Sequence, residues 1–281
     1  MAAEPISLQE AAERLGVHYM TVYRYVRTGR LPARRVGAQW QIDPHDLAVV
    51  ASTAGQPGRF VAGGTRPPRA ELRRRMVDRL VAGDEPGSWA VAQAALAGGA
   101  VPEEVVIDGI AAAMRTIGDL WEAGELTVDD EHRASAVASR LVGRLGPLSA
   151  RRGPTLYTVV LGCPAGERHG LPTALSANVL RGRGYGVVDL GPDVPADAFA
   201  EAVVKAGHPV AAAVAVTAGD HDRAVRAIVR AVRARSPGVR VLLGGAGVAG
   251  AAHAERLGAA WSGPDARTLA TALDEGRLGR S

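Results

Sequence analysis

Residues 154–190, PTLYTVVLGCPAGERHGLPTALSANVLRGRGYGVVDL, contain the pattern that decides the fold. A strand-like apolar run at 156–163 is followed by a helical pattern at 172–183 and a second apolar run at 186–190. Short apolar runs that alternate with helical patterns are typical of βαβ units in a parallel sheet.

The same alternation continues to the end of the chain. We expect further strands at 210–217, 239–243 and 259–261, and further helices at 197–206, 220–235, 249–257 and 265–276. Residues 153–281 are therefore predicted to form an α/β doubly wound, Rossmann-like parallel sheet. Ligands of such sheets bind at the carboxyl ends of the strands.

The preceding segment, residues 69–150, is predicted to be a four-helix bundle. Gly124 ends the third helix, and Thr127 with Asp130 forms a capping box for the fourth. The helix boundary at Gly124 brings four side chains to one corner of the bundle: Trp121, Val128, Glu131 and His132. On spacing alone, a buried tryptophan beside a surface Glu-His pair is the plainer interpretation.

Residues 1–50 predict a winged helix-turn-helix head. Ser7 and Glu10 form a capping box, two short helices follow, and two extended runs around Gly37 resemble a wing. A helix in the major groove and a basic wing on the backbone can bind DNA. The expected contacts are Tyr19, Thr21, Tyr23, Arg24, Arg34, Arg35 and Gln39. The alternative is a helical module for protein interaction with solvated arginines.

Composition narrows the class of protein. Residues 51–68 are rich in Gly and Pro and predict a flexible linker. The 33 basic and 29 acidic residues give +4, a weak signal for nucleic acid, and the single Cys163 excludes a disulfide framework. No signal segment or long apolar run is present, so we expect a cytoplasmic protein that does not enter a membrane.

One expected helix carries four arginines, Arg223, Arg226, Arg230 and Arg233. They could contact DNA or a partner, but a solvated helix face is the plainer interpretation.

Two ligands are conceivable at the strand ends. Residues 245–250 satisfy G-x-G-x-x-G, but they follow the fourth strand instead of the first, so a dinucleotide site fits poorly. Glu167 lies two residues before His169 and can accept one ring N–H, which leaves the other nitrogen for a metal. A single histidine without a second protein ligand nearby implies a metal that arrives already chelated.

These residues resemble the cobalamin-binding signature. Glu167-x-His169, then Ala215-Val216-Thr217, then Gly244-Gly245 follow its D/E-x-H-x-x-G, S-x-L/T and G-G elements. The resemblance implies that the corrin lies on the strand ends, with His169 as the lower cobalt ligand and Glu167 behind it. It also implies that the cofactor's tail enters beside Thr217 and the paired glycines.

The corner of the bundle extends the resemblance. Trp121, nine residues and Glu131-His132 are similar to the W-x9-EH signature of the CarH/LitR-like family of B12-dependent, light-responsive transcriptional regulators, which also carry a MerR-type head. The family implies adenosylcobalamin as cofactor, with Trp121, Val128, Glu131 and His132 around its 5′-deoxyadenosyl group.

The family likewise implies how such a chain acts. It implies a non-enzymatic regulator that binds a double-stranded DNA operator as a homo-oligomer, a dimer or a tetramer. Arg168, Gly184 and Asp193 fall at positions where protomers of the family meet, although surface charge and a loop glycine explain them equally.

Three residues depart from the family pattern. Pro172 replaces the signature glycine, Ala215 replaces the usual serine, and Glu122 stands where light-sensing members have a second cobalt-binding histidine. A bis-histidine photoproduct through position 122 is impossible here. The alternatives are a corrinoid carrier for a methyltransferase, and a regulator that senses another tetrapyrrole or senses B12 without light.

Overall fold

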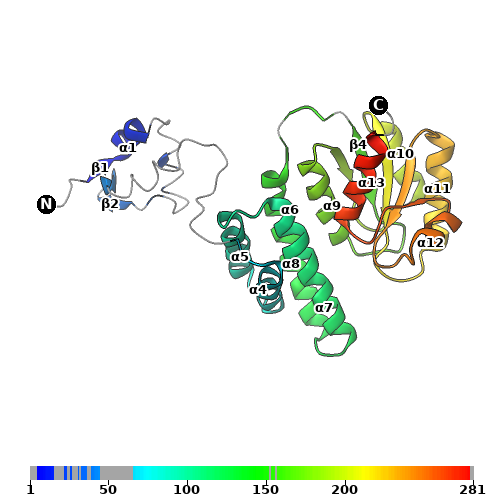
Figure 1. The fold of residues 1–281 in the computed structure, drawn as a ribbon, viewed down its shortest axis with the longest axis horizontal. Helices are drawn as coiled ribbons and strands as arrows, with labels where there is room; N and C mark the ends of the chain where they lie inside the picture. The colour runs from blue at the N-terminus through cyan, green and yellow to red at the C-terminus, as the bar shows by residue number, and fades with distance from the viewer. Residues whose placement is uncertain are drawn as a thin grey trace. The chain divides into compact units, whose positions relative to one another are not determined.

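The computed structural model describes residues 5–15, 22–23, 26, 31, 33–36, 39–44, 66–151, 153–155 and 157–278 (Figure 1). The described residues of the head, within residues 1–65, form one compact unit together with residues 97–99, and the described residues of 66–96 and 100–281 form another.

The head contains a small antiparallel sheet beside one helix. Its elements are β1 (Ile6–Ser7), α1 (Leu8–Leu15), β2 (Arg34–Val36) and β3 (Gln39–Ile42), with strand order β1-β3-β2. The β2–β3 hairpin agrees with the two extended runs expected for a wing, whereas β1 was not predicted because two residues show no periodicity. The predicted capping box is confirmed: Glu10 accepts hydrogen bonds from the Ser7 amide and hydroxyl, both at 2.8 Å.

A hydrophobic cluster in the head corrects one orientation. Val22 is fully buried and Val26 packs against the same cluster, as the helical spacing predicts. Tyr23, which we expected to contact DNA and therefore to point away from this core, is half-buried and packs against it.

The second unit has a five-stranded parallel sheet. Its strands are β4 (Thr158–Gly162), β5 (Gly186–Asp189), β6 (Pro209–Ala215), β7 (Arg240–Gly244) and β8 (Ala260–Trp261), in the order β5-β4-β6-β7-β8. Val160 pairs with Val188 on one side and Ala212 on the other. The order reverses at β4, so a crevice for ligands is expected between the carboxyl ends of β4 and β6.

Helices cover both faces of this sheet. They are α9 (Leu171–Gly182), α10 (Ala196–Lys205), α11 (Asp222–Arg235), α12 (Ala251–Arg256) and α13 (Ala266–Leu278). α9 packs with α13 on one face, and α10 packs with α11 on the other (Figure 1). Because both faces are covered, the side chains of Val159 and Val160 are fully buried.

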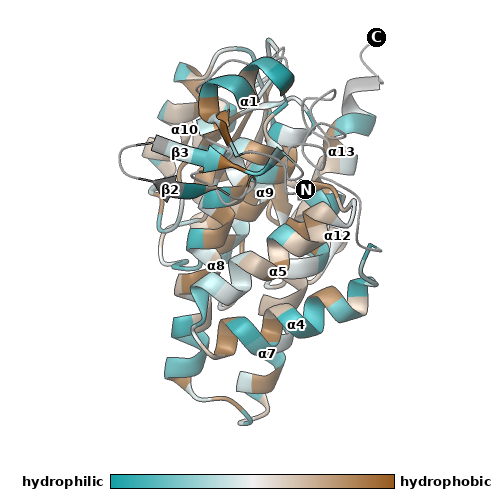
Figure 2. Ribbon diagram, turned by 90° about the vertical axis from the view of Figure 1, so that its left-hand side faces the viewer, coloured by the Kyte–Doolittle hydropathy of each residue, from teal (hydrophilic) through white to brown (hydrophobic). Residues whose placement is uncertain are grey.

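The helical bundle precedes the sheet and is here called the cap. Its elements are α4 (Arg69–Val81), α5 (Glu85–Ala97), α6 (Pro102–Glu104), η1 (Val105–Ala111), α7 (Ala112–Glu122) and α8 (Val128–Ser149). Hydrophobic and hydrophilic residues alternate along the cap helices in Figure 2, as expected for helices with one buried face. Leu72, Met76 and Leu80 are buried as their spacing predicts.

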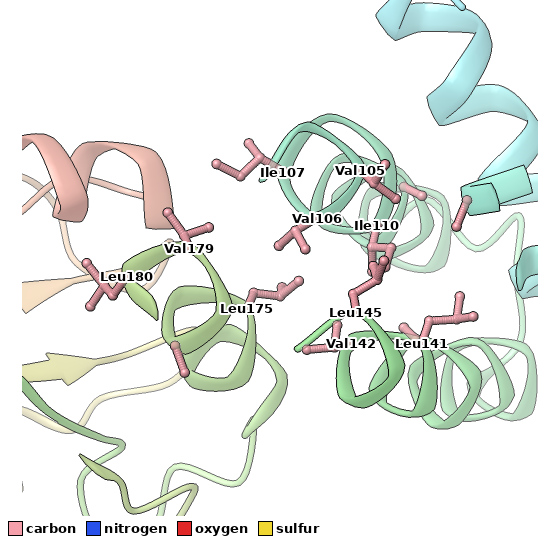
Figure 3. Close-up of a cluster of buried hydrophobic side chains, with 14 of the residues drawn as sticks. Val105, Val106, Ile107, Ile110, Leu141, Val142, Leu145, Leu175, Val179 and Leu180 are labelled. Atoms are coloured by element: carbon pink, nitrogen blue, oxygen red, sulfur yellow. The ribbon is translucent and has the colours of Figure 1, made fainter. Parts of the chain in front are cut away.

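The third predicted helix has a π-helical segment, η1, that the sequence did not reveal. Five of its seven residues are buried, because this segment packs against α4 and α8 of the cap and also against α9 of the sheet unit (Figure 3). A π segment places more side chains around the axis than the 3.6-residue period allows, which suits a helix that is covered on more than one side.

The base of the cap is attached to the sheet unit by polar contacts as well. Arg183, which follows α9, donates to Glu103 of α6 at 2.8 Å and to Asp274 of α13 at 3.0 Å. The buried Asn178 donates to the Val142 carbonyl at 2.7 Å. Arg267 of α13 pairs with Asp108 of η1 at 2.9 Å. These contacts fix the base of the cap against α9 and α13.

Candidate functional site

The loop between β4 and α9 lies at the switch point of the sheet. Gly166 has φ +88°, a left-handed conformation that glycine adopts without strain. Its amide donates to the Asp193 carboxylate at 2.7 Å, and the Asp193 amide donates to the Glu167 carbonyl at 2.9 Å. The loop is thus tied to the segment that follows β5.

Glu167 is the centre of this loop. Its side chain is 1% exposed. Oε1 accepts from the His169 amide at 3.0 Å and faces His169 Nδ1 at 2.5 Å, while Oε2 accepts from the Thr217 amide at 2.8 Å and the Ala218 amide at 3.1 Å. One carboxylate therefore joins the loops after β4 and β6.

The electrostatics of Glu167 favour the ionised form. Burial acts to raise the pKa of Glu167, but hydrogen bonds from the amides of His169, Thr217 and Ala218, with the His169 ring, together lower that pKa below its usual value. An ionised carboxylate on Nδ1 holds the His169 ring in the tautomer with a proton on Nδ1. The Nε2 atom is then the one available to a metal.

His169 itself is accessible. Its side chain is 56% exposed, and among the described residues no group of three or more His, Cys, Asp or Glu side chains could hold a metal ion. That His169 is the single protein ligand of a metal that brings its other ligands along stays a prediction.

A second histidine, which the sequence did not indicate, lies beside Glu167. His221 Nε2 lies 3.9 Å from Glu167 Oε2, and the His221 side chain is 16% exposed. A Cβ atom added at Gly166 would lie 3.4 Å from this ring, so the imidazole packs directly against the loop. Its position four residues after Thr217 was the available signal.

The paired glycines lie where two backbone segments approach. A Cβ atom at Gly244 would lie 2.7 Å from the Gly263 carbonyl oxygen, and one at Gly245 would lie 2.2 Å from the Val216 carbonyl oxygen. Larger residues therefore cannot occupy either position without moving these segments. That the glycines also leave room for a cofactor tail stays a prediction.

The structure also shows the positions of Thr217 and Ala215 at the end of β6 and of Pro172, which replaces the signature glycine. Thr217 contributes its backbone N–H to Glu167, and Ala215 is the half-buried last residue of β6. Pro172 lies in the first turn of α9, where its missing N–H costs no helical hydrogen bond. The glycine run 245–250 leads into α12, a helix of six residues.

The corner of the cap gathers the other predicted side chains. Trp121 lies in the last turn of α7 and is 45% exposed, Val128 begins α8 and is 56% exposed, and Gly124 turns the chain between them with φ +75°. Exposed large apolar side chains at one corner are typical of a binding surface.

Polar groups at this corner are held within α8. His132 Nδ1 faces the Val128 carbonyl at 2.9 Å, and Glu131 accepts from the Ser135 hydroxyl at 2.6 Å. The capping box that starts α8 is confirmed, since Thr127 and Asp130 exchange hydrogen bonds. Among the described residues, no hydrogen bond or ion pair joins this corner to His169.

The remaining predicted residues are distributed over the surface or lie outside the described residues. Arg168 is exposed, Gly184 has φ +88° after α9, and Asp193 binds the Gly166 amide. Arg34 is exposed on β2, and Arg35 and Gln39 belong to β2 and β3 by their backbone. Tyr19, Thr21 and Arg24 lie outside the described residues.

Among the helices that the structure describes, none combines the length and the apolar composition that a bilayer-spanning helix requires.

Comparison with known families supports two kinds of module. Residues 72–145 and 157–273 each match a family model described as a B12 binding domain. Residues 6–52 match a helix-turn-helix domain. The helical cap and the Rossmann-like parallel sheet thus fit a cobalamin-binding domain, preceded in the chain by a helix-turn-helix match.

Individual relatives fall into two classes. Trimethylamine corrinoid protein 1 of Methanosarcina acetivorans is 32% identical over 136 residues, 47% of this chain and 63% of that protein. The HTH-type transcriptional repressor CarH of Myxococcus xanthus is 34% identical over 151 residues, 52% of this chain and 48% of that protein. The chain therefore spans less than two thirds of either relative.

A solved structure shows the same fold. The monomethylamine corrinoid protein of Methanosarcina barkeri superposes with a TM-score of 0.66 at 21% sequence identity, covering 74% of this chain and 99% of that chain. The corrinoid-protein fold accordingly includes both the cap and the sheet.

Proposed function

We propose that this chain is a DNA-binding transcriptional regulator that senses adenosylcobalamin, and light through it, in the cytoplasm. The observation that carries the proposal is the Glu167–His169 pair at the sheet's switch point, in a chain that also matches a helix-turn-helix domain. In this proposal a metal-ligand histidine accounts for the binding of a corrinoid, and the head allows corrinoid binding to control DNA binding.

The residues of the loop fit a cobalt corrinoid. When bound, adenosylcobalamin would supply a cobalt ion that a protein nitrogen can hold, together with a light-sensitive cobalt–carbon bond. His169 Nε2 would hold the cobalt, while Glu167 fixes the ring's orientation and tautomer through Nδ1. The glycines at 244 and 245 allow the close backbone approaches beside the strand ends.

The corner of the cap serves the other side of the cofactor in this proposal. Trp121 and Val128 offer apolar surface to the adenosyl group, and Glu131 can accept hydrogen bonds from its ribose hydroxyls. Because Glu122 is exposed at the end of α7 and is no cobalt ligand of the usual kind, any light-state ligand must be a different group.

Oligomerisation provides the switch. One small head binds DNA weakly, whereas several heads in one homo-oligomer gain effective concentration on adjacent half-sites. We propose that the dark, adenosylcobalamin-bound chain forms a dimer or tetramer, with Arg168, Gly184 and Asp193 near the contact, and that photolysis disrupts it. The chain performs no enzymatic reaction in this proposal.

The test is to measure mass and DNA binding of one preparation in three states. The full chain is examined without cofactor, with adenosylcobalamin in the dark, and after illumination. We expect a larger mass and tighter duplex binding only in the dark, cofactor-bound state. Equal mass and equal binding in all three states would contradict the switch.

A second candidate function is a corrinoid carrier for a methyltransferase. The trimethylamine corrinoid protein relatives favour it, since they match 47% of the chain at 32% and 30% identity, close to the 34% identity over 52% of the chain for CarH. The two functions differ in the upper ligand: a carrier must retain methylcobalamin, whereas the exposed Trp121 and Val128 suit the bulkier adenosyl group. Competition between the two cofactors for the apo chain therefore separates them.

A further inference from the structure

The outer face of α11 is almost entirely arginine. Every exposed residue of this helix is an arginine except Ala234. Four of them recur at intervals of three, four and three residues, which places them along one side of the helix. We call Arg223, Arg226, Arg230 and Arg233 the arginine stripe.

The charges of the stripe are not neutralised within the described structure. Arg223 and Arg230 make no hydrogen bond or ion pair with any described residue, and Arg226 and Arg233 donate to uncharged carbonyls. The only acidic residue of α11, Asp222, is engaged by His253 at 2.8 Å.

Another arginine-rich helix, α4, behaves differently. It carries Glu71 and Asp78 among its arginines, and both acids pair with Arg74 at 2.7 and 3.7 Å. Arg235, just beyond the stripe, is likewise paired, with Glu201 of α10. The stripe thus keeps a concentrated positive charge, whereas carboxylates offset part of the arginine charge on α4 and the charge of Arg235.

Its dimensions and chemistry favour a phosphate backbone. Ten residues of α-helix span about 15 Å, and one DNA strand carries a phosphate about every 3.4 Å along the axis, so the stripe can reach several phosphates. Guanidinium groups bind phosphate oxygens in a bidentate manner. The exposed part of α11 offers no large apolar side chain, whereas the centre of a protein–protein interface requires them.

A hollow continues the same surface. Arg233 and Arg240 line an open hollow of about 420 Å³ together with residues 237–239. Arg240 therefore adds a further arginine beside the end of the stripe.

We propose that the arginine stripe is a second, sequence-independent DNA contact, which binds backbone phosphates of the duplex. The inference rests on the proposed function for the identity of the polyanion, since the helix-turn-helix match is what makes duplex DNA its partner. The proposed contact lies on α11 of the sheet unit, so it is additional to any DNA contact of the head.

The experiment compares two double variants of the full chain. Arg223→Gln with Arg230→Gln removes the two stripe residues that have no partner, so folding is undisturbed. Arg73→Gln with Arg75→Gln removes the same charge from exposed positions of α4. Binding to a fluorescent 30-base-pair duplex of random sequence is measured by anisotropy over a range of KCl concentrations.

The salt dependence decides the outcome. Each lost phosphate contact lowers the slope of log K against log [salt] by about 0.9, so we expect the stripe variant to lose a slope of about 1.8 and the control to keep the wild-type slope. Equal slopes for the two variants would overturn the inference. So would a stripe variant that binds duplex normally but loses affinity for poly-glutamate, because the partner would then be an acidic protein. A wild-type chain that binds no duplex at any salt would instead remove the DNA-binding function itself.

Discussion

The two sides of the proposed cobalamin site differ in how the chain holds them. On the sheet side, Glu167 is 1% exposed and accepts from three backbone amides as well as facing the His169 ring. On the cap side, Trp121 and Val128 are about half exposed, and the His132 side chain is 75% exposed. The sheet side is thus organised by hydrogen bonds of the protein itself, whereas the cap side exposes apolar side chains.

The largest expected effect is on the organised side. Glu167→Ala leaves the amides of His169, Thr217 and Ala218 without their acceptor, and each buried unsatisfied donor costs about 1–3 kcal/mol. We expect the free energy of unfolding to fall by about 3 kcal/mol, measured by urea denaturation of the apo chain.

The control for that variant is Glu255→Ala, at an exposed position on α12. A change within about 0.5 kcal/mol is expected there, as for surface substitutions in general. If both variants unfold at the same urea concentration, the sheet side is not organised by Glu167.

The next effect is on the cap side. Trp121→Ala removes the large exposed apolar side chain, so we expect about a tenfold loss in adenosylcobalamin affinity, since burying an aromatic side chain contributes about 1.5–3 kcal/mol. Stability of the apo chain should stay within about 0.5 kcal/mol of wild type. Titration calorimetry with adenosylcobalamin and with methylcobalamin measures both the loss and its selectivity for the adenosyl form. Trp121→Phe, which keeps an aromatic ring, serves as the matched control, and an unchanged affinity in the alanine variant would place the adenosyl group elsewhere.

A smaller effect concerns the turn that brings the corner together. Thr127→Ala removes the cap of α8 and should lower stability by about 1 kcal/mol. Thr127→Ser retains the hydroxyl and should keep most of the stability that the alanine variant loses. Thermal unfolding of the three proteins checks this, and equal midpoints would show that the capping box does not stabilise the corner.

The smallest effect appears with pH. Because the pKa of Glu167 is lowered in the folded chain, its contribution to stability is fully present above the unfolded pKa near 4.5 and is lost as pH falls through the folded value. Wild type should therefore lose more stability than Glu167→Gln below pH 4.5, and the two should run parallel between pH 5 and 7. Urea denaturation at each pH gives the difference, and parallel curves throughout would contradict the lowered pKa.

Much of the fold was predictable because its signals are local. Strands such as 210–217, observed as β6, are apolar runs bounded by turn residues, and the capping boxes at Ser7 and Thr127 require only a four-residue pattern. The π-helical η1 was not predictable, since part of its burial comes from α9, which begins sixty residues after the end of η1.

The candidate site was likewise predictable only where its residues lie close together in the sequence. Glu167 and His169 are two residues apart, so their contact followed from spacing. The amides of Thr217 and Ala218 reach Glu167 across 50 residues, and their role depends on strand register, which the sequence does not state. His221 was missed for the same reason.

The central claim is that His169 Nε2 coordinates the cobalt of a corrinoid. The most direct measurement is the absorbance spectrum of the chain after incubation with adenosylcobalamin in the dark and gel filtration, for wild type and for His169→Ala. The account predicts that wild type retains the cofactor with the spectrum of a histidine-ligated cobalt. Mutation of groups behind a metal ligand alone costs about 10–100-fold, so His169→Ala should lose about 100-fold or more in affinity along with that spectrum. A wild-type chain that elutes colourless, or a variant with the same spectrum and affinity as wild type, would contradict it.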